Sequence, residues 1–110
     1  MRKRWTRWSV LGREVTDGAG EVVGKVVDTY PFDGGEVELV VLRLAGAFGG
    51  KRMLAVDDLW DDGFALSTPF AGWQIEDSPP LTGGRHAAED PYRARSYWRF
   101  EEPALFSVAA

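Results

Sequence analysis

The chain has 110 residues, the length of one compact domain. It contains no cysteine and a single histidine, His86, which excludes a disulfide framework, a thiolate metal site and a zinc site built on several histidines. No apolar run approaches the ~20 residues of a membrane-spanning helix, and the first ten residues lack the apolar stretch of a secretory signal. These features predict a soluble, cytoplasmic protein.

The net charge of −4 is distributed unevenly along the chain. Residues 1–13 contain five basic and no acidic side chains, residues 14–90 contain five basic and fifteen acidic ones, and residues 91–110 contain three basic and two acidic ones. A surface that binds nucleic acid must meet the phosphates with lysine or arginine. The acidic body therefore disfavours nucleic-acid binding everywhere except at the basic N-terminus.

The first half of the chain predicts three short strands joined by tight turns. Valine, leucine and tyrosine dominate the expected strands, which cover residues 8–15, 21–30 and 36–44. Asp17-Gly18-Ala19-Gly20 and Asp33-Gly34-Gly35 lie between them and supply the positive-φ positions that hairpin turns require. A meander of antiparallel strands is the expected result.

Two features of these strands favour a curved sheet that is covered on both sides. Val23 and Val26 both suit the core but lie three residues apart, which predicts a β-bulge at Gly24-Lys25. The run Leu39-Val40-Val41-Leu42 is apolar on both faces of its strand, so we expect a second segment to cover the face that does not line the core. The C-terminal tail is the expected cover.

The second half of the chain predicts two further strands, over residues 51–56 and 64–67, separated by an acidic loop at residues 57–62. Thr68 is the expected N-cap of a short helix and Pro69 its first residue, because hydroxyl side chains cap helices and proline suits the first helical position.

Together, these elements resemble the PRC-barrel family, named for the cytoplasmic domain of the photosynthetic reaction centre H subunit and found also in the ribosome maturation factor. The matching segments lie between Val10 and Leu81: LGREVTDGAGEVVGKVVDTY, GGEVELVVLRL, KRMLAVDDL, and FAL followed by TPFAGWQIEDSPPL. The resemblance implies a mostly β fold, a small barrel of five to six short strands with a short helical turn after the last strand. It also implies a non-enzymatic scaffolding or docking module, with no catalytic residues and no cofactor.

We therefore expect three parts: a basic aromatic arm at residues 1–8, a PRC-barrel-like domain at 9–81 and an aromatic tail at 82–110. Within the tail, Asp90 and Pro91 predict the start of a short helix, since aspartate caps helices and proline begins them.

The tail also contains the candidate residues for binding a protein partner. Aromatic and arginine side chains are enriched in interface hot spots. These candidates are Tyr97, Trp98, Arg99 and Phe106. Residues 104–108 predict an extended segment that is able to add to a sheet edge. Two alternatives stay open, since the tail can cover its own barrel or dock on another protein, and a homodimer would satisfy both.

The N-terminal arm carries a second set of candidates, for an anionic surface such as RNA. Cations pair with phosphates and indole rings stack on bases. The set comprises Arg2, Lys3, Arg4, Trp5 and Arg7. An RNA- or ribosome-associated assembly factor is therefore an alternative function. The competing interpretations are a disordered N-terminus or a Trp8 side chain that closes one end of the barrel.

The acidic loop at residues 57–62 suggests a third function, the binding of a divalent ion. Its four aspartates provide hard oxygen ligands, but Leu59 and Trp60 occupy positions where the calcium-loop pattern has ligands. A solvated acidic loop is the favoured interpretation, and we expect no metal site.

Overall fold

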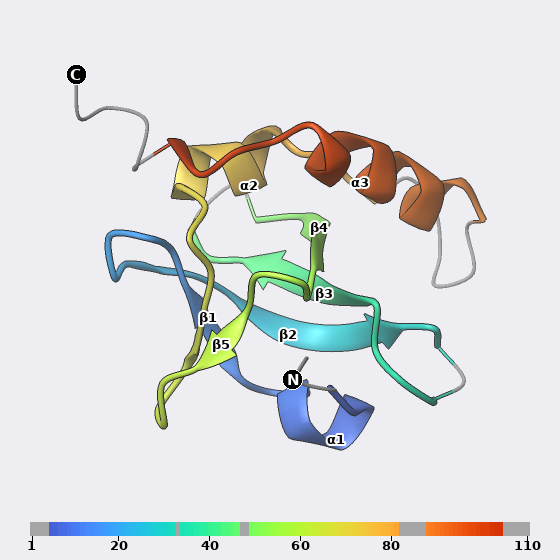
Figure 1. Cartoon of the computed structure of the whole chain (residues 1–110), viewed down its shortest axis with the longest axis horizontal. Coiled ribbons are helices and arrows are strands. Elements are labelled where there is room, and N and C mark those ends of the chain that lie inside the picture. The colour runs from blue at the N-terminus through green and yellow to red at the C-terminus, as the bar shows by residue number, and fades with distance from the viewer. Residues whose placement is uncertain (1–4, 33, 47–48, 82–87, 105–110) are drawn as a thin grey trace.

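The computed structural model describes residues 5–32, 34–46, 49–81 and 88–104. The described residues form three helices and six strands around one mixed sheet (Figure 1). In chain order they are α1 (Arg7–Val10), β1 (Glu14–Thr16), β2 (Val22–Tyr30), β3 (Leu39–Leu44), β4 (Lys51–Ala55), β5 (Trp60–Asp61), β6 (Leu66–Ser67), α2 (Gly72–Asp77) and α3 (Glu89–Arg99).

The sheet has the strand order β4-β3-β2-β1-β6-β5. Strands β1 to β4 form an antiparallel meander, β6 lies parallel to β1, and β5 pairs antiparallel with β6. Strands β4 and β5 are the two edges, so strand pairing among the described residues leaves the sheet open. The predicted mostly β fold is confirmed, whereas closure into a barrel is not.

The turn between β1 and β2 forms as the sequence predicts. One carboxylate oxygen of Asp17 accepts hydrogen bonds from the backbone N–H groups of Ala19 and Glu21, both at 2.9 Å. Gly20 adopts φ +85°, a conformation that side chains with a Cβ rarely adopt. The side chain of one aspartate therefore holds the turn in shape.

The first predicted strand is wrong over its N-terminal half, because residues 7–10 form helix α1. A capping box explains this outcome: the Thr6 hydroxyl accepts a hydrogen bond from the Ser9 N–H, while the Ser9 hydroxyl accepts one from the Thr6 N–H. The helix directs Val10 into the core and leaves Trp8 on the surface. Trp8 is 84% exposed, so the prediction that it closes one end of a barrel is also wrong.

The predicted bulge at Gly24-Lys25 is displaced along the strand. The register shifts at Val23, opposite β1, and at Val27, opposite β3, while Gly24 pairs regularly with Val15 and Leu44. A Cβ atom on Gly24 would lie 2.6 Å from the backbone oxygen of Arg43. The glycine therefore permits a close approach of two strands instead of forming the bulge itself.

The short helix α2 begins later than expected, at Gly72, with Ala71 as its N-cap. Thr68 and Pro69 precede the helix and do not start it. The side chain of Gln74 instead reaches back to accept a hydrogen bond from the Ala71 N–H at 2.9 Å, which satisfies this buried donor at the start of the helix.

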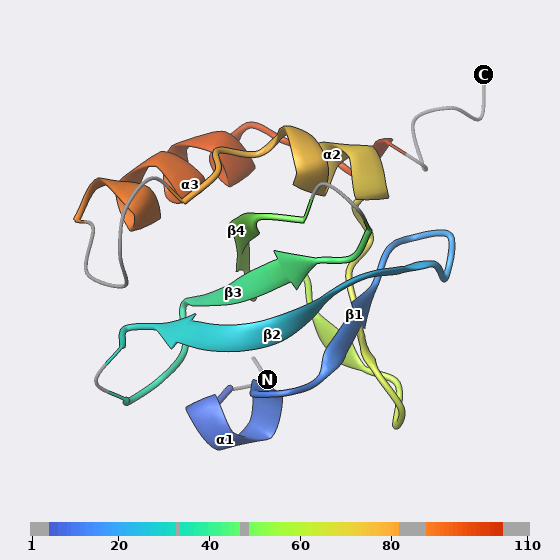
Figure 2. The same ribbon diagram turned by 180° about the vertical axis from the view of Figure 1, so that it is seen from behind.

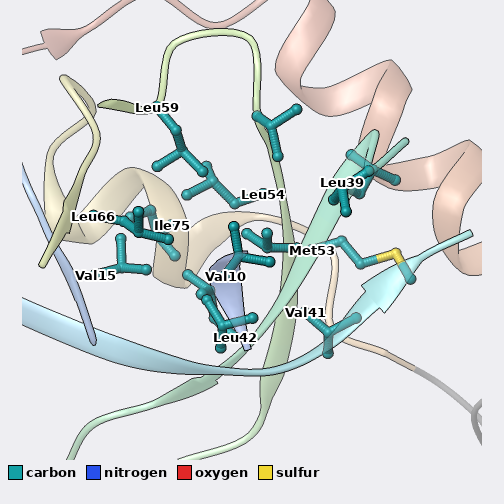
Figure 3. Packing of buried hydrophobic residues seen from close by; sticks show 14 of the residues in the cluster. Val10, Val15, Leu39, Val41, Leu42, Met53, Leu54, Leu59, Leu66 and Ile75 are labelled. Atoms are coloured by element: carbon teal, nitrogen blue, oxygen red, sulfur yellow. The ribbon is translucent and has the colours of Figure 1, made fainter. Parts of the chain in front are cut away.

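The core fills both sides of strand β3, as the apolar run in its sequence predicts. Val40, Val41 and Leu42 are each at most 2% exposed. Successive side chains of a strand point to opposite faces, and Figure 3 shows Val41 with Met53 on the side that faces α3, while Leu42 lies beside Val10 on the other side. The ribbons of α2 and α3 lie on one side of β2 and β3, and the ribbon of α1 lies on the other (Figure 2).

Helix α3 of the tail covers the sheet of its own chain. Ala94 and Trp98 are buried in the same hydrophobic core as the strands, and Tyr97 packs against it. The Trp98 indole N–H donates a hydrogen bond to the backbone oxygen of Met53 in β4 at 2.8 Å. Phe106 lies outside the described residues.

The segment after α3 is held by the buried side chain of Gln74, which is 2% exposed. Its amide nitrogen donates a hydrogen bond to the backbone oxygen of Glu102 at 2.7 Å, and its amide oxygen accepts one from the Ala104 N–H at 3.0 Å. One side chain thus joins α2 to the chain beyond α3.

Replacing Gln74 with alanine is expected to lower the free energy of unfolding by about 3 kcal/mol, because three hydrogen bonds are lost and the buried Ala71 N–H is left without its acceptor. Urea unfolding followed by circular dichroism measures this change. The matched control is Glu76→Ala on the exposed face of the same helix, for which we expect a change within about 0.5 kcal/mol. Equal effects of the two substitutions would contradict the anchoring role of Gln74.

Candidate functional site: a groove beside helix α3

A groove of about 1020 Å³ lies between helix α3, the segment that leads into β3, and the loop after β4. Its floor consists of buried apolar side chains: Trp5, Val37, Leu39, Val56, Leu59, Phe70 and Trp98. Its rim consists of exposed polar, charged and tyrosine side chains: Glu36, Glu38, Asp57 and Asp58 on the sheet side, and Tyr92, Arg95, Ser96 and Arg99 on the helix side.

Trp98, in the floor of the groove, packs against two other aromatic rings. The ring centroids of Phe70 and Trp98 are 4.6 Å apart, and Tyr97 meets Trp98 edge to face at 4.9 Å. Such pairs contribute about 0.5–1.5 kcal/mol each beyond the burial of their surface. Burial raises the pKa of Tyr97 above its usual value, so its phenol stays protonated and donates a hydrogen bond to the backbone oxygen of Gln74 at 2.6 Å.

Trp5 reaches the floor because the N-terminal segment pairs with the chain before β3. The Val37 N–H donates a hydrogen bond to the backbone oxygen of Trp5 at 2.9 Å, and Thr6 and Glu36 form an isolated antiparallel bridge. The Trp5 side chain is only 4% exposed. An indole that is buried in this way cannot stack on a base of RNA.

One ion pair ties the two walls of the groove together. The Arg95 guanidinium on the helix lies 2.5 Å from the Glu38 carboxylate and 5.3 Å above the Tyr30 ring. Both charged side chains are about half exposed, so the pair contributes less than about 1 kcal/mol, with a similar amount from the ring. Arg95 therefore connects helix α3 to the sheet side of the groove but adds little to the stability of the fold.

The rim has an excess of negative charge. Four carboxylates line it against the two guanidinium groups of Arg95 and Arg99, and Glu38 already pairs with Arg95. Within residues 5–32, 34–46, 49–81 and 88–104, neither Glu36 nor Asp58 forms an ion pair. The sheet wall thus presents carboxylates that are available to a positively charged group.

The basic arm is only partly described by the structure. Arg7 donates hydrogen bonds to Asp28 at 2.6 Å and to the Thr29 hydroxyl at 3.1 Å, so its guanidinium holds α1 against β2. Arg2, Lys3 and Arg4 lie outside the described residues. Of the five candidates for an anionic surface, Trp5 and Arg7 are therefore engaged by the fold.

The aspartates at the end of the acidic loop shape the chain around β5. Asp61 pairs with Arg13 at 2.8 Å. Asp62 accepts hydrogen bonds from the N–H groups of Phe64 and Ala65 at 2.9 and 2.8 Å. The part of the chain that the structure describes contains no cluster of three histidine, cysteine or carboxylate side chains suited to hold a metal ion.

The structure brings only some of the sequence-based candidates to the groove. Trp98 lies in the floor of the groove and Arg99 in its rim, whereas the Tyr97 hydroxyl is directed to α2. Tyr92 and Arg95 also line the groove and were not among the candidates. A helical signal was available for them, because Tyr92, Arg95, Ser96 and Arg99 stand at positions i, i+3, i+4 and i+7, which share one face of a helix.

No family model and no curated protein matches this chain. Among the described helices, none is both long and apolar enough to cross a membrane.

We expect the free energy of unfolding to decrease at acidic pH as the Asp62 carboxylate becomes protonated. Hydrogen bonds from the Ala65 and Phe64 N–H groups hold the pKa of Asp62 below its usual value of 3.8, so its contribution is complete above that pH and is lost as the pH falls through the lower pKa of the folded state. Urea unfolding at a series of pH values should show a shallower acid dependence for Asp62→Asn than for the unchanged protein.

A carbon-13 titration of the Asp62 carboxyl group provides the direct check. A pKa at or above 3.8 in the folded protein, or identical acid dependence in the two proteins, would contradict this description of the loop.

Proposed function

We propose that this protein is a non-enzymatic binding module that docks a protein partner in the groove beside α3. The observation that carries the proposal is the arrangement of the groove: a packed aromatic and aliphatic floor below a rim of exposed charged and tyrosine side chains. Stable protein interfaces have this anatomy, with an apolar centre and a polar border.

The fold that we propose for this module is PRC-barrel-like. The supporting features are the order of the elements: a hairpin of β1 and β2, an antiparallel meander through β4, and the short helix α2 just before Pro79 and Pro80. A module of this kind acts by holding partners together, which agrees with a site that offers surfaces for contact and no paired acid and base.

A protein partner accounts for the groove better than RNA does. The carboxylates of Glu36, Glu38 and Asp58 would repel phosphates, and Trp5 is buried in the floor. RNA or ribosome association remains a prediction that concerns Arg2, Lys3 and Arg4.

Site-specific photocrosslinking tests the docking proposal. A benzophenone amino acid at Ser96, which is exposed on the helix wall, should form a covalent adduct with one protein in the native cells, because a partner in the groove passes within reach of this position. Mass spectrometry of the adduct identifies that protein. An adduct with a second copy of this chain would identify a homodimer that uses the groove.

The matched control places the same amino acid at Trp73, an exposed aromatic position on α2 that does not line the groove. The proposal expects the adduct from Ser96 alone. Adducts from neither position, or the same adducts from both, would contradict docking in the groove.

A further inference from the structure

Resting on the docking function proposed above, we infer that the segment of the partner that enters the groove is a peptide with a lysine or arginine beside an apolar side chain. The positive charge lies against the Glu36 and Asp58 wall, and the apolar side chain lies on the floor. The inference assigns a chemical class to a partner that the docking proposal leaves unspecified.

The net negative charge of the rim favours a positively charged group on the partner. Glu36 and Asp58 are exposed, line the same wall, and have no ion pair among the described residues, whereas the guanidinium of Arg95 is held by Glu38 and the Tyr30 ring. A cation that enters the groove therefore meets two carboxylates that no other charge of the described residues neutralises, and it can form charge-assisted hydrogen bonds with them. An anionic ligand would have to displace Glu38 to reach Arg95, and at Arg99 it would meet a rim whose four carboxylates outnumber its two guanidinium groups.

The floor selects an apolar side chain. Its polar atoms are already used within the protein, since the Trp98 indole N–H is bonded to Met53 and the neighbouring Tyr97 hydroxyl to Gln74. A polar side chain on this floor would lose its water without gaining a hydrogen bond, at a cost in free energy. Aliphatic and aromatic side chains carry no such cost.

On the wall of the groove that leads into β3, recognition occurs through side chains. Three backbone N–H groups there and at the end of β4 are already engaged: Val37 bonds to Trp5, Glu38 to Tyr30 and Val56 to Glu38. A partner segment therefore finds no unpaired strand edge among these residues, in contrast to β-augmentation. The combination of charge and apolar contact must supply the specificity.

Selection of short random peptides by phage display tests this inference. The target is the full chain, and parallel selections use the double variant Glu36→Lys with Asp58→Lys and the matched control Glu21→Lys with Glu76→Lys, whose side chains are exposed away from the groove. Thermal unfolding first confirms that both variants fold. Nitrogen-15 NMR of the unchanged protein then shows whether each selected peptide shifts the resonances of Tyr92 and Ser96.

We expect groove-binding peptides that combine basic with aromatic or aliphatic residues, bind the groove variant about tenfold or more weakly, and bind the control variant as they bind the unchanged protein. Groove-binding peptides with no excess of basic residues, or with equal affinity for the double variant, would overturn this inference and leave docking intact. A selection that yields no peptide for the groove would overturn both proposals.

Discussion

The structure depends on the attachment of helix α3 to the sheet through Trp98. Trp98 is 7% exposed, its indole N–H donates a hydrogen bond to the backbone oxygen of Met53, and its ring packs against Phe70 at a tilt and against Tyr97 edge to face. A buried indole whose N–H had no acceptor would cost about 1–3 kcal/mol, so the hydrogen bond and the aromatic packing specify the same position of the helix. Because α3 is fixed in this way, its exposed face becomes one wall of the groove.

The sequence predicted the features of the fold that depend on local chemistry. The turn at Asp17 followed from an aspartate beside glycines. The burial of both faces of β3, with Val41 on one of them, followed from a strand sequence without a polar face. It failed where two local patterns compete: residues 7–10 contain strand-forming residues, but the capping box of Thr6 and Ser9 stabilises a helix. Sheet closure depends on which distant edges meet, and the parallel pairing of β1 with β6 has no signal in either segment.

The groove was predicted only in part, for a related reason. Trp98 and Arg99 stood out because aromatic and arginine side chains are enriched in interfaces, and both line the groove. Glu36 was not among the candidates and Asp58 was assigned to a solvated acidic loop, since isolated acidic residues on strands and loops usually have no further role. Their importance appears only when the fold brings them opposite α3, which is a consequence of tertiary structure.

Hydrogen exchange of the five tryptophan indoles is the most direct test of this account. One nitrogen-15 spectrum resolves them, and Trp8 and Trp73, at 84% and 55% exposed, serve as internal references for fast exchange. We expect the Trp98 indole N–H to exchange more slowly than these references by at least about a hundredfold, because it is buried and bonded to Met53. Exchange of Trp98 at the rate of the exposed indoles would show that α3 is not attached to the sheet and would contradict the groove.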